Sequence, residues 1–195
     1  MTDKINHSSI PELKIAVLGK SLVGKSALTF RFINDRFPGE HDTTIEDSYT
    51  VPTQIDDISC QLEILDTAGQ DDYQTMIDTW INSADGYLLV YSIDNKDSFE
   101  GVKMRYERIL TIKEKLKNFS IAIVGNKCDL EEKREVTREE ANKYCQELGV
   151  TFLEVSALQK INVKEAFLTV ARDLLKKKYP KLYKKKGGLK RCYCF

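Results

Sequence analysis

The sequence predicts an α/β fold, with a doubly wound, mostly parallel six-stranded sheet, one antiparallel edge strand and about five helices. Short apolar segments of strand length alternate along the chain with longer segments of helical periodicity, as in parallel strands joined by crossover helices. Two strand-like segments are separated only by the acidic pair Asp56 and Asp57, which indicates a hairpin and hence one antiparallel strand. A chain of 195 residues is long enough to bury one sizeable core.

Strands are expected where apolar residues run together or alternate with polar ones. The first is a largely apolar run that stops at Gly19, as in a strand buried on both faces. The two segments beside the acidic pair alternate, as half-buried strands do. The expected strands are Leu13–Leu18, Tyr49–Ile55, Ile58–Asp66, Gly86–Ser92, Ile121–Gly125 and Thr151–Val155.

Helices are expected where apolar residues recur with helical spacing. Two of them begin with capping-box patterns, Asp97 with Glu100 and Thr137 with Glu140. Gly149 then ends the second of these helices. The assigned helices are Ser26–Asn34, Asp97–Lys117, Thr137–Leu148 and Val163–Lys178.

The chain divides into three parts. Residues 1–11 are expected to form a flexible N-terminal extension, residues 12–178 a single domain, and residues 179–195 a polybasic tail. The first residues lack the apolar segment of a secretory signal, and Thr2 stands where N-myristoylation requires glycine. The five cysteines follow neither a zinc nor a disulfide spacing, which indicates the reducing cytosol.

The net charge of zero is the sum of an acidic domain and a basic tail. Of 30 basic residues, residues 176–195 hold nine and no acidic residue, so the remainder carries a net charge of −9. An acidic domain argues against nucleic acid as a partner. The tail suggests an anionic surface, such as the inner leaflet of a membrane.

Gly19–Ser26 (GKSLVGKS) fits the pattern G-x-x-x-x-G-K-[ST] between an expected strand and an expected helix. The glycines, Gly24 among them, let backbone N–H groups surround phosphates, and the helix N-terminus adds its dipole. Lys25 is expected to reach the β- and γ-phosphates, and Ser26 to bind Mg²⁺. The alternative is an ordinary glycine-containing turn. The motif in this context predicts the fold of a P-loop NTPase.

A second motif, DTAGQ at Asp66–Gln70, follows the third expected strand. Asp66 can hold Mg²⁺ through water, and Gly69 can bring a backbone N–H to the γ-phosphate. Gln70 can orient an attacking water. We therefore expect Lys25, Gly69 and Gln70 to take part in phosphate hydrolysis. By itself, the motif is also compatible with a polar turn.

Two further motifs, NKCD at Asn126–Asp129 and SAL at Ser156–Leu158, predict a guanine site. The Asp129 carboxylate can accept both N–H groups of the guanine edge, a pair that adenine lacks. The stem of Lys127 can lie over the purine, and the N–H of Ala157 can meet the guanine O6.

Gly19, Asp66, Asn126 and Ser156 all lie at or just past the ends of expected strands. Ligands of doubly wound sheets bind beyond the carboxyl ends of the strands. One topology therefore brings the four motifs to one rim.

These motifs resemble those of Ras-family small GTPases over about residues 12–178 and the terminal tail. The most specific stretch, Thr44–Tyr49 (TIEDSY), resembles the switch I effector loop of Ras and Rap proteins. The resemblance implies that Thr44 binds Mg²⁺ and the γ-phosphate in the GTP state, with a catalytic role, and that Phe37 packs against guanine. It adds Ser21, Val23 and Ala27 to the nucleotide-binding residues. The implied effector loop is Asp42, Thr43, Thr44, Ile45, Glu46, Asp47, Ser48 and Tyr49.

The chain departs from the Ras pattern at several positions. Ser21 and Leu22 replace two glycines of Ras, and a side chain at the first position impairs assisted hydrolysis in Ras, although many Rab proteins carry serine there. Ile77 and Trp80 stand where Ras has Arg and Tyr, which leaves the identity of the exchange factor open.

The C-terminus, Cys192-Tyr-Cys-Phe195, fits C-a-a-X, although its middle residues are not aliphatic. The terminal Phe favours a geranylgeranyl group on Cys192. One lipid anchors only marginally, so the lysines of the tail are expected to supply the second signal. The alternatives are a solvated tail and a nuclear import signal.

The expected function is a membrane-tethered GTP/GDP switch in signal transduction that uses Mg²⁺ and works as a monomer. The expected partners are an exchange factor, a GTPase-activating protein and a Ras-binding-type effector, at the cytoplasmic face of the plasma membrane or an endomembrane. One alternative is a GTP-locked module that recruits effectors. Another is a P-loop phosphotransferase, against which NKCD argues.

Overall fold

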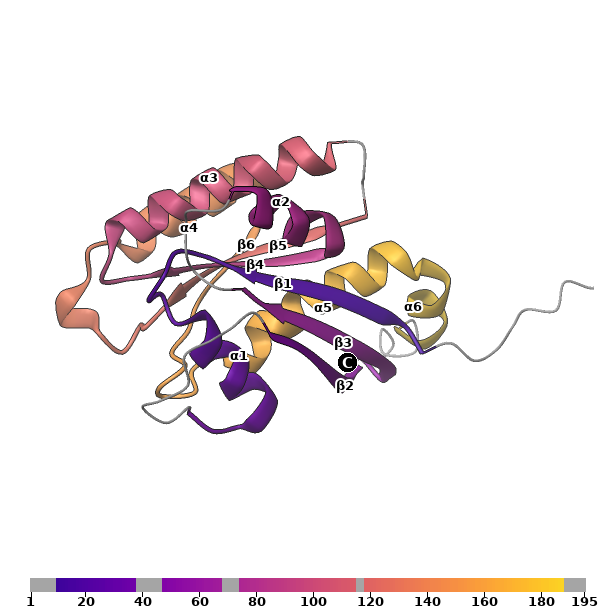
Figure 1. The fold of residues 1–195 in the computed structure, drawn as a ribbon. Coiled ribbons are helices and arrows are strands. Elements are labelled where there is room, and N and C mark those ends of the chain that lie inside the picture. The colour runs from indigo at the N-terminus through magenta and orange to yellow at the C-terminus, as the bar shows by residue number, and fades with distance from the viewer. Residues whose placement is uncertain (1–9, 38–46, 68–73, 115–117, 188–195) are drawn as a thin grey trace, which may run out of the picture.

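The computed structural model describes residues 10–37, 47–67, 74–114 and 118–187. They form one six-stranded sheet with helices on both faces (Figure 1). The strand order is β2-β3-β1-β4-β5-β6. The strands are β1 (Glu12–Leu18), β2 (Asp47–Ile55), β3 (Ile58–Asp66), β4 (Gly86–Ser92), β5 (Ser120–Asn126) and β6 (Thr151–Glu154).

The strand pairing confirms the predicted fold class. β1 pairs in parallel with β3 and β4, and β4, β5 and β6 continue the parallel sheet. β2 runs antiparallel to β3 at the edge. The hairpin turn places Asp56 and Asp57 at φ 47° and 65°, the left-handed pair that a tight two-residue hairpin requires.

The described helices comprise the four assigned from the sequence and two more. They are α1 (Lys25–Asn34), α2 (Gln74–Ser83), α3 (Lys96–Lys113), α4 (Arg138–Leu148), α5 (Val163–Lys178) and α6 (Pro180–Gly187), with a short 3₁₀ helix, η1 (Glu131–Lys133). Helix α6 lies within the residues that we assigned to the tail.

The start of α3 differs from the expectation. Asn95, not Asp97, is the N-cap, because its side-chain oxygen accepts the N–H of Ser98 at 2.8 Å. Asp97 lies instead in the first turn of the helix. Thr137 caps α4 as predicted, accepting the N–H of Glu140 at 3.1 Å, and Gly149 ends that helix at φ 66°.

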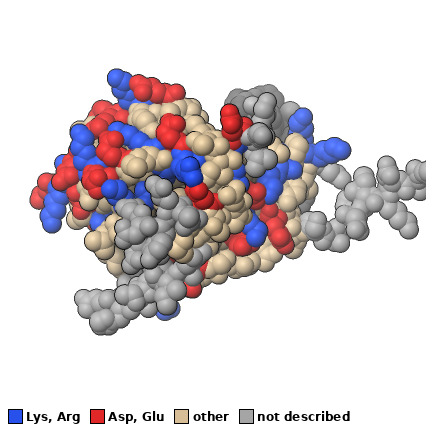
Figure 2. All heavy atoms as spheres, turned by 45° about the horizontal axis from the view of Figure 1, so that its top comes forward, with Lys and Arg blue, Asp and Glu red and all other residues tan. Residues whose placement is uncertain are grey.

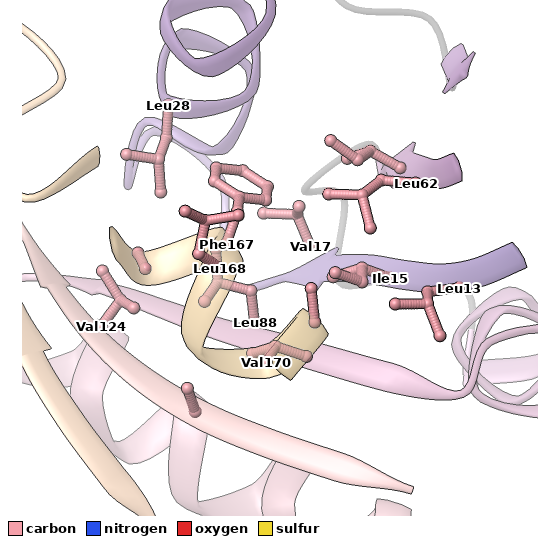
Figure 3. Packing of buried hydrophobic residues seen from close by; sticks show 14 of the residues in the cluster. Leu13, Ile15, Val17, Leu28, Leu62, Leu88, Val124, Phe167, Leu168 and Val170 are labelled. Carbon is pink, nitrogen blue, oxygen red and sulfur yellow. The ribbon is translucent and has the colours of Figure 1, made fainter. Parts of the chain in front are cut away.

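Two apolar clusters fill the space between the sheet and its helices. Helices α1, α5 and α6 cover one face, and α2, α3 and α4 cover the other (Figure 1). In Figure 3, Phe167 and Val170 of α5 lie beside Val17 of β1 and Leu88 of β4. Burial on both faces explains why the central strands are so apolar. On the opposite face, Trp80 of α2 is only 5% exposed.

Helix α6 packs back against α5 and the β2–β3 hairpin. The Tyr183 hydroxyl donates to the Asp56 carboxylate at 2.8 Å, and Arg172 of α5 lies 3.3 Å from the same carboxylate. Lys176 lies over the Tyr183 ring, 5.3 Å from its centroid. Burial opposes the charge on Asp56, but the Tyr183 hydrogen bond and Arg172 outweigh it and lower the pKa of Asp56.

The surface carries both signs of charge. On the face shown in Figure 2, basic and acidic side chains are interspersed rather than gathered into a basic stripe. Within the described parts of the chain, no helix has the length and apolar character needed to cross a membrane.

Candidate nucleotide-binding site

The loop between β1 and α1 has the form of a phosphate cradle. Lys25, the first residue of α1, is 5% exposed, and its ammonium donates to the carbonyls of Gly19 at 3.0 Å and Lys20 at 2.9 Å. The N-terminus of α1 has no side-chain cap and no acidic residue in its first turn. A helix N-terminus without a cap, next to a held ammonium group, suits an anion.

Position 24 requires glycine because Asn126 leaves no room for a side chain. Its φ of 89° is left-handed, and a Cβ at this position would lie 2.5 Å from the side-chain nitrogen of Asn126. That nitrogen donates to the carbonyl of Val23 at 2.8 Å. Any side chain at position 24 would therefore both strain the backbone and displace the asparagine. The phosphate-binding loop and the NKCD motif are in this way joined directly.

Asp66, at the end of β3, provides the chemistry of a cation site. It is 2% exposed, and its Oδ1 has no hydrogen-bond partner among the described residues. Burial raises the pKa of Asp66, while the Ser26 hydrogen bond and the charge of Lys25 act in the opposite direction without cancelling it. A buried carboxylate oxygen beside a hydroxyl is the kind of hard donor pair that Mg²⁺ binds. These residues therefore fit a magnesium ion.

The loops after β5 and β6 meet at the opposite end of the site. The hydroxyl of Ser156 donates to Asp129, and it accepts the N–H of Gln159 at 2.9 Å. The N–H of Ala157 donates to the side-chain oxygen of Asn126 at 3.3 Å. Ser156 thus orients the carboxylate that we expect to recognise guanine, and Asn126 contacts both ends of the site.

An arginine that the sequence analysis did not identify supports the SAL loop. Arg31 of α1 donates from Nε to the carbonyl of Ala157 at 2.8 Å and from a terminal nitrogen to that of Leu158 at 2.6 Å. Lys160 lies 2.5 Å from Asp35, which caps the end of the same helix. The helix that begins at the phosphate cradle therefore also holds the loop that we expect to meet the base.

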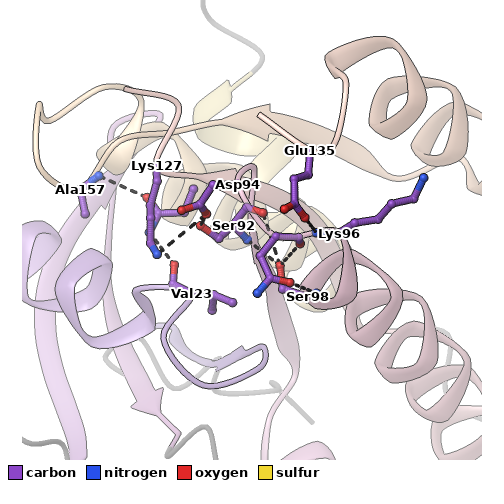
Figure 4. Close-up of polar contacts among 10 residues, drawn as sticks. Val23, Ser92, Asp94, Lys96, Ser98, Lys127, Glu135 and Ala157 are labelled. Atoms are coloured by element: carbon purple, nitrogen blue, oxygen red, sulfur yellow. Dashed lines mark hydrogen bonds and ion pairs between the residues drawn. The ribbon is translucent and has the colours of Figure 1, made fainter. Parts of the chain in front are cut away.

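Lys127 belongs to a polar network at the ends of β4 and β5 (Figure 4). Its ammonium lies 4.0 Å from Asp94, which also accepts a hydrogen bond from the Ser92 hydroxyl. The backbone N–H of Ser92 in turn donates to the Ser98 hydroxyl at 3.0 Å. The structure holds Lys127 at φ 62°, so both its backbone and its charged end are positioned.

Comparison with known proteins identifies the family. The profile of the Ras family matches residues 14–176. The chain is also 46% identical over 181 residues to the Ras-like protein rasB of Dictyostelium discoideum, covering 91% of each chain. The chain belongs to the Ras family. It is therefore a small GTPase, which binds guanine nucleotide and hydrolyses GTP to GDP and phosphate.

The structure brings together most of the residues predicted for this Ras-family site. Gly19, Val23, Lys25 and Ser26 lie along the phosphate-binding loop, with Ser21 and Leu22 exposed on its rim, Leu22 at 90% exposure and φ 65°. Ala27 follows in α1, and Phe37, 45% exposed, lies beyond its end. The predicted residues Thr44, Gly69, Gln70 and Cys192 lie outside the described residues, as do positions 42–46 of the effector loop.

The part of the effector loop that the structure describes begins β2. Asp47 and Ser48 are exposed, and the Tyr49 hydroxyl lies 3.2 Å from the Asp47 carboxylate. Asp47 also pairs with Asp66 in the β2–β3 register. The exposed start of β2 therefore lies directly beside the residue that fits magnesium.

Proposed function

We propose that this Ras-family protein is a magnesium-dependent GTP/GDP switch in signal transduction, tethered to a membrane by its C-terminus. The observation that carries the proposal is the hydrogen bond from Asn126 to Val23, because it joins the base motif to the phosphate motif. A ligand that fits both ends has a purine, a spacer and phosphates.

In this proposal, the residues divide by the part of the nucleotide that they contact. Residues 19–27 hold the phosphates, with Lys25 on the β- and γ-phosphates. Asp129, oriented by Ser156, accepts the guanine N–H groups, and the Ala157 N–H meets O6. Lys127, positioned beside Asp94, lies along the purine, with Phe37 across from it.

Bound Mg²⁺ would neutralise charge on the phosphates. Ser26 and Thr44 would hold it directly, and Asp66 through water. The unpartnered Oδ1 of Asp66 supports this assignment, because a buried carboxylate oxygen without a partner is costly.

For hydrolysis, Gln70 orients the attacking water, and the N–H of Gly69 and the charge of Lys25 stabilise the transferred phosphoryl group. Without an arginine supplied by a partner, hydrolysis is expected to be slow. GTP would order Thr44 and Gly69 around the γ-phosphate, and an effector would read residues 42–49 until hydrolysis releases them.

A geranylgeranyl group on Cys192 and the lysines of the tail would tether the protein to the cytoplasmic face of the plasma membrane or an endomembrane. An exchange factor, an activating protein and a Ras-binding-type effector would act there. The membrane test is flotation with anionic vesicles of the lipidated chain and of Cys192→Ser. Equal flotation of both would contradict the tether.

The first test identifies the nucleotide that the purified chain retains, by chromatography after denaturation. Stoichiometric GDP is the expected result, and chelation of magnesium should speed its release. An adenine nucleotide, or GDP release that is insensitive to chelation, would contradict the proposal.

A second candidate function, a GTP-locked effector-recruiting module, is favoured by the exposure of Ser21 and Leu22 on the rim of the phosphate loop. In that case the purified chain would retain mostly GTP. Hydrolysis stimulated by an activating protein would be poor and would be restored by Ser21→Gly.

A further inference from the structure

Lys20 lies in the phosphate-binding loop, but its side chain is directed to α3. Its ammonium lies 2.6 Å from the carboxylate of Asp97 in the first turn of that helix. Its backbone carbonyl accepts a hydrogen bond from the ammonium of Lys25 at 2.9 Å. One residue therefore contacts both α3 and the lysine that we place on the phosphates.

Gly101 within α3 leaves the space in which the Lys20 side chain lies. A Cβ on Gly101 would lie 2.9 Å from both Cγ and Cε of Lys20, closer than carbon atoms approach. The same Cβ would lie 3.0 Å from a terminal nitrogen of Arg105. Glycine is an unfavourable residue within a helix, so its presence here calls for a local reason. The structure provides one, since the stem of Lys20 occupies the space that a side chain would take.

The packing against Gly101, rather than the ion pair, is the main part of this contact. The Asp97 side chain is 76% exposed and that of Lys20 is 27% exposed. An ion pair as exposed as this one contributes little and is screened by salt. The stem of Lys20, packed against Gly101, instead restricts where its backbone, and hence its carbonyl, can lie.

We infer that Lys20 is a positioning residue for nucleotide binding, seated on Gly101 of α3, and that α3 thereby supports the phosphate-binding loop. The inference rests on the proposed contact of Lys25 with the phosphates. A side chain at position 101 displaces the stem of Lys20, shifts its carbonyl and so weakens the hydrogen bond that this carbonyl accepts from the Lys25 ammonium. The consequence is weaker binding of the β-phosphate, with no direct effect on the base.

The test measures dissociation of a fluorescent GDP analogue from the full chain. Gly101→Ala and Lys20→Ala should each raise the dissociation rate about threefold or more. In the Lys20→Ala background, Gly101→Ala should add clearly less than it does in wild type, because the stem that it displaces is gone and only the contact with Arg105 remains. Met104→Ala, a change at a 70% exposed position of the same helix, is the matched control and should keep the wild-type rate.

A second readout separates positioning from general damage. Competition with GDP and with GMP should show reduced affinity for GDP and unchanged affinity for GMP, since only GDP has a β-phosphate. Additive effects of the two alanines, no effect of either, or equal losses for GDP and GMP would overturn the inference.

If Gly101→Ala fails to fold, a comparison of Lys20→Met with Lys20→Ala tests the same inference. Methionine keeps an apolar stem over Gly101, so it should raise the rate less than alanine does. Equal GDP dissociation rates in the two variants would show that the stem of Lys20 has no role in positioning. Failure of wild type to bind any guanine nucleotide would instead contradict the proposed function itself.

Discussion

The side-chain amide of Asn126 donates a 2.8 Å hydrogen bond to the carbonyl of Val23, while its oxygen accepts the N–H of Ala157 at 3.3 Å. Asn126 is 1% exposed, so both partners lie away from water. A single side chain thus connects the loop after β1 with the loop after β6. The spacing between the phosphate motif and the base motif depends on this connection.

Asn126→Ala should therefore weaken nucleotide binding more than it weakens the fold elsewhere. It removes the connection and leaves a buried carbonyl without its donor, at a cost of about 1–3 kcal/mol. We expect the GDP dissociation rate to rise about tenfold or more, as measured with a fluorescent analogue. Asn142→Ala, at an exposed position of α4, is the control. An unchanged rate in Asn126→Ala would show that the connection has no role in binding.

Arg31→Met should loosen the SAL loop. The guanidinium donates two hydrogen bonds to carbonyls of that loop, and methionine keeps part of the stem while removing both donors. Hydrogen bonds from charged groups contribute about 1.5–3 kcal/mol each, although partial exposure reduces this here. We expect faster amide exchange at residues 157–159 and faster GDP release. Arg138→Met, on the exposed start of α4, serves for comparison, and the prediction fails if both variants behave alike.

Tyr183→Phe should weaken the docking of α6 on the hairpin. The change removes the hydroxyl that donates to Asp56 and keeps the ring, so it isolates one hydrogen bond worth about 1 kcal/mol. Amide exchange in residues 181–187 should become faster, with nucleotide binding unaffected. Tyr179→Phe removes a hydroxyl from a neighbouring tyrosine as a matched control. Equal protection of α6 in wild type and Tyr183→Phe would contradict the prediction.

The docking of α6 should also depend on acid pH. The pKa of Asp56 lies below its ordinary value of 3.8 in the folded chain. Its contribution to stability is therefore fully present above that ordinary value and is lost as the pH falls through the lowered pKa. The difference in urea unfolding free energy between wild type and Asp56→Asn should be constant above the ordinary pKa of 3.8 and should shrink as the pH falls below it. A difference that stays constant as the pH falls below 3.8 would exclude the Asp56 charge as its source.

Much of the sheet was predictable because its strands are short apolar segments with clear ends. Ile58–Asp66 and Gly86–Ser92 were predicted with the bounds that the structure shows. The hairpin followed from Asp56 and Asp57, which adopt the left-handed backbone that acidic turn residues tolerate. Loops of parallel strands share one edge of the sheet, so the four motifs were expected to meet there.

The contacts that support the site were not predictable in the same way. Arg31 holds carbonyls 126 and 127 positions away in the chain, and a single sequence gives no signal for such a pair. Helix α6, in contrast, does have a sequence signal. The apolar residues Tyr179, Leu182 and Tyr183 recur with helical spacing, and all three pack on the core. The lysines around them led us to assign a tail. The N-cap of α3 was misassigned because Asn95 and Asp97 both lie near the start of the helical pattern, and both have side chains that can cap a helix.

Folding of α6 onto the domain also determines how far Cys192 can reach from the domain. Eight helical residues advance the chain by about 12 Å, whereas the same residues extended would reach about 28 Å. Only four residues then lie between Gly187 and Cys192, so these two positions can be at most about 18 Å apart. A lipid at Cys192 would therefore be joined to the domain by a short tether that starts near the β2–β3 hairpin. It would limit how far the domain can turn above a bilayer, and loss of the Tyr183 contact would lengthen it.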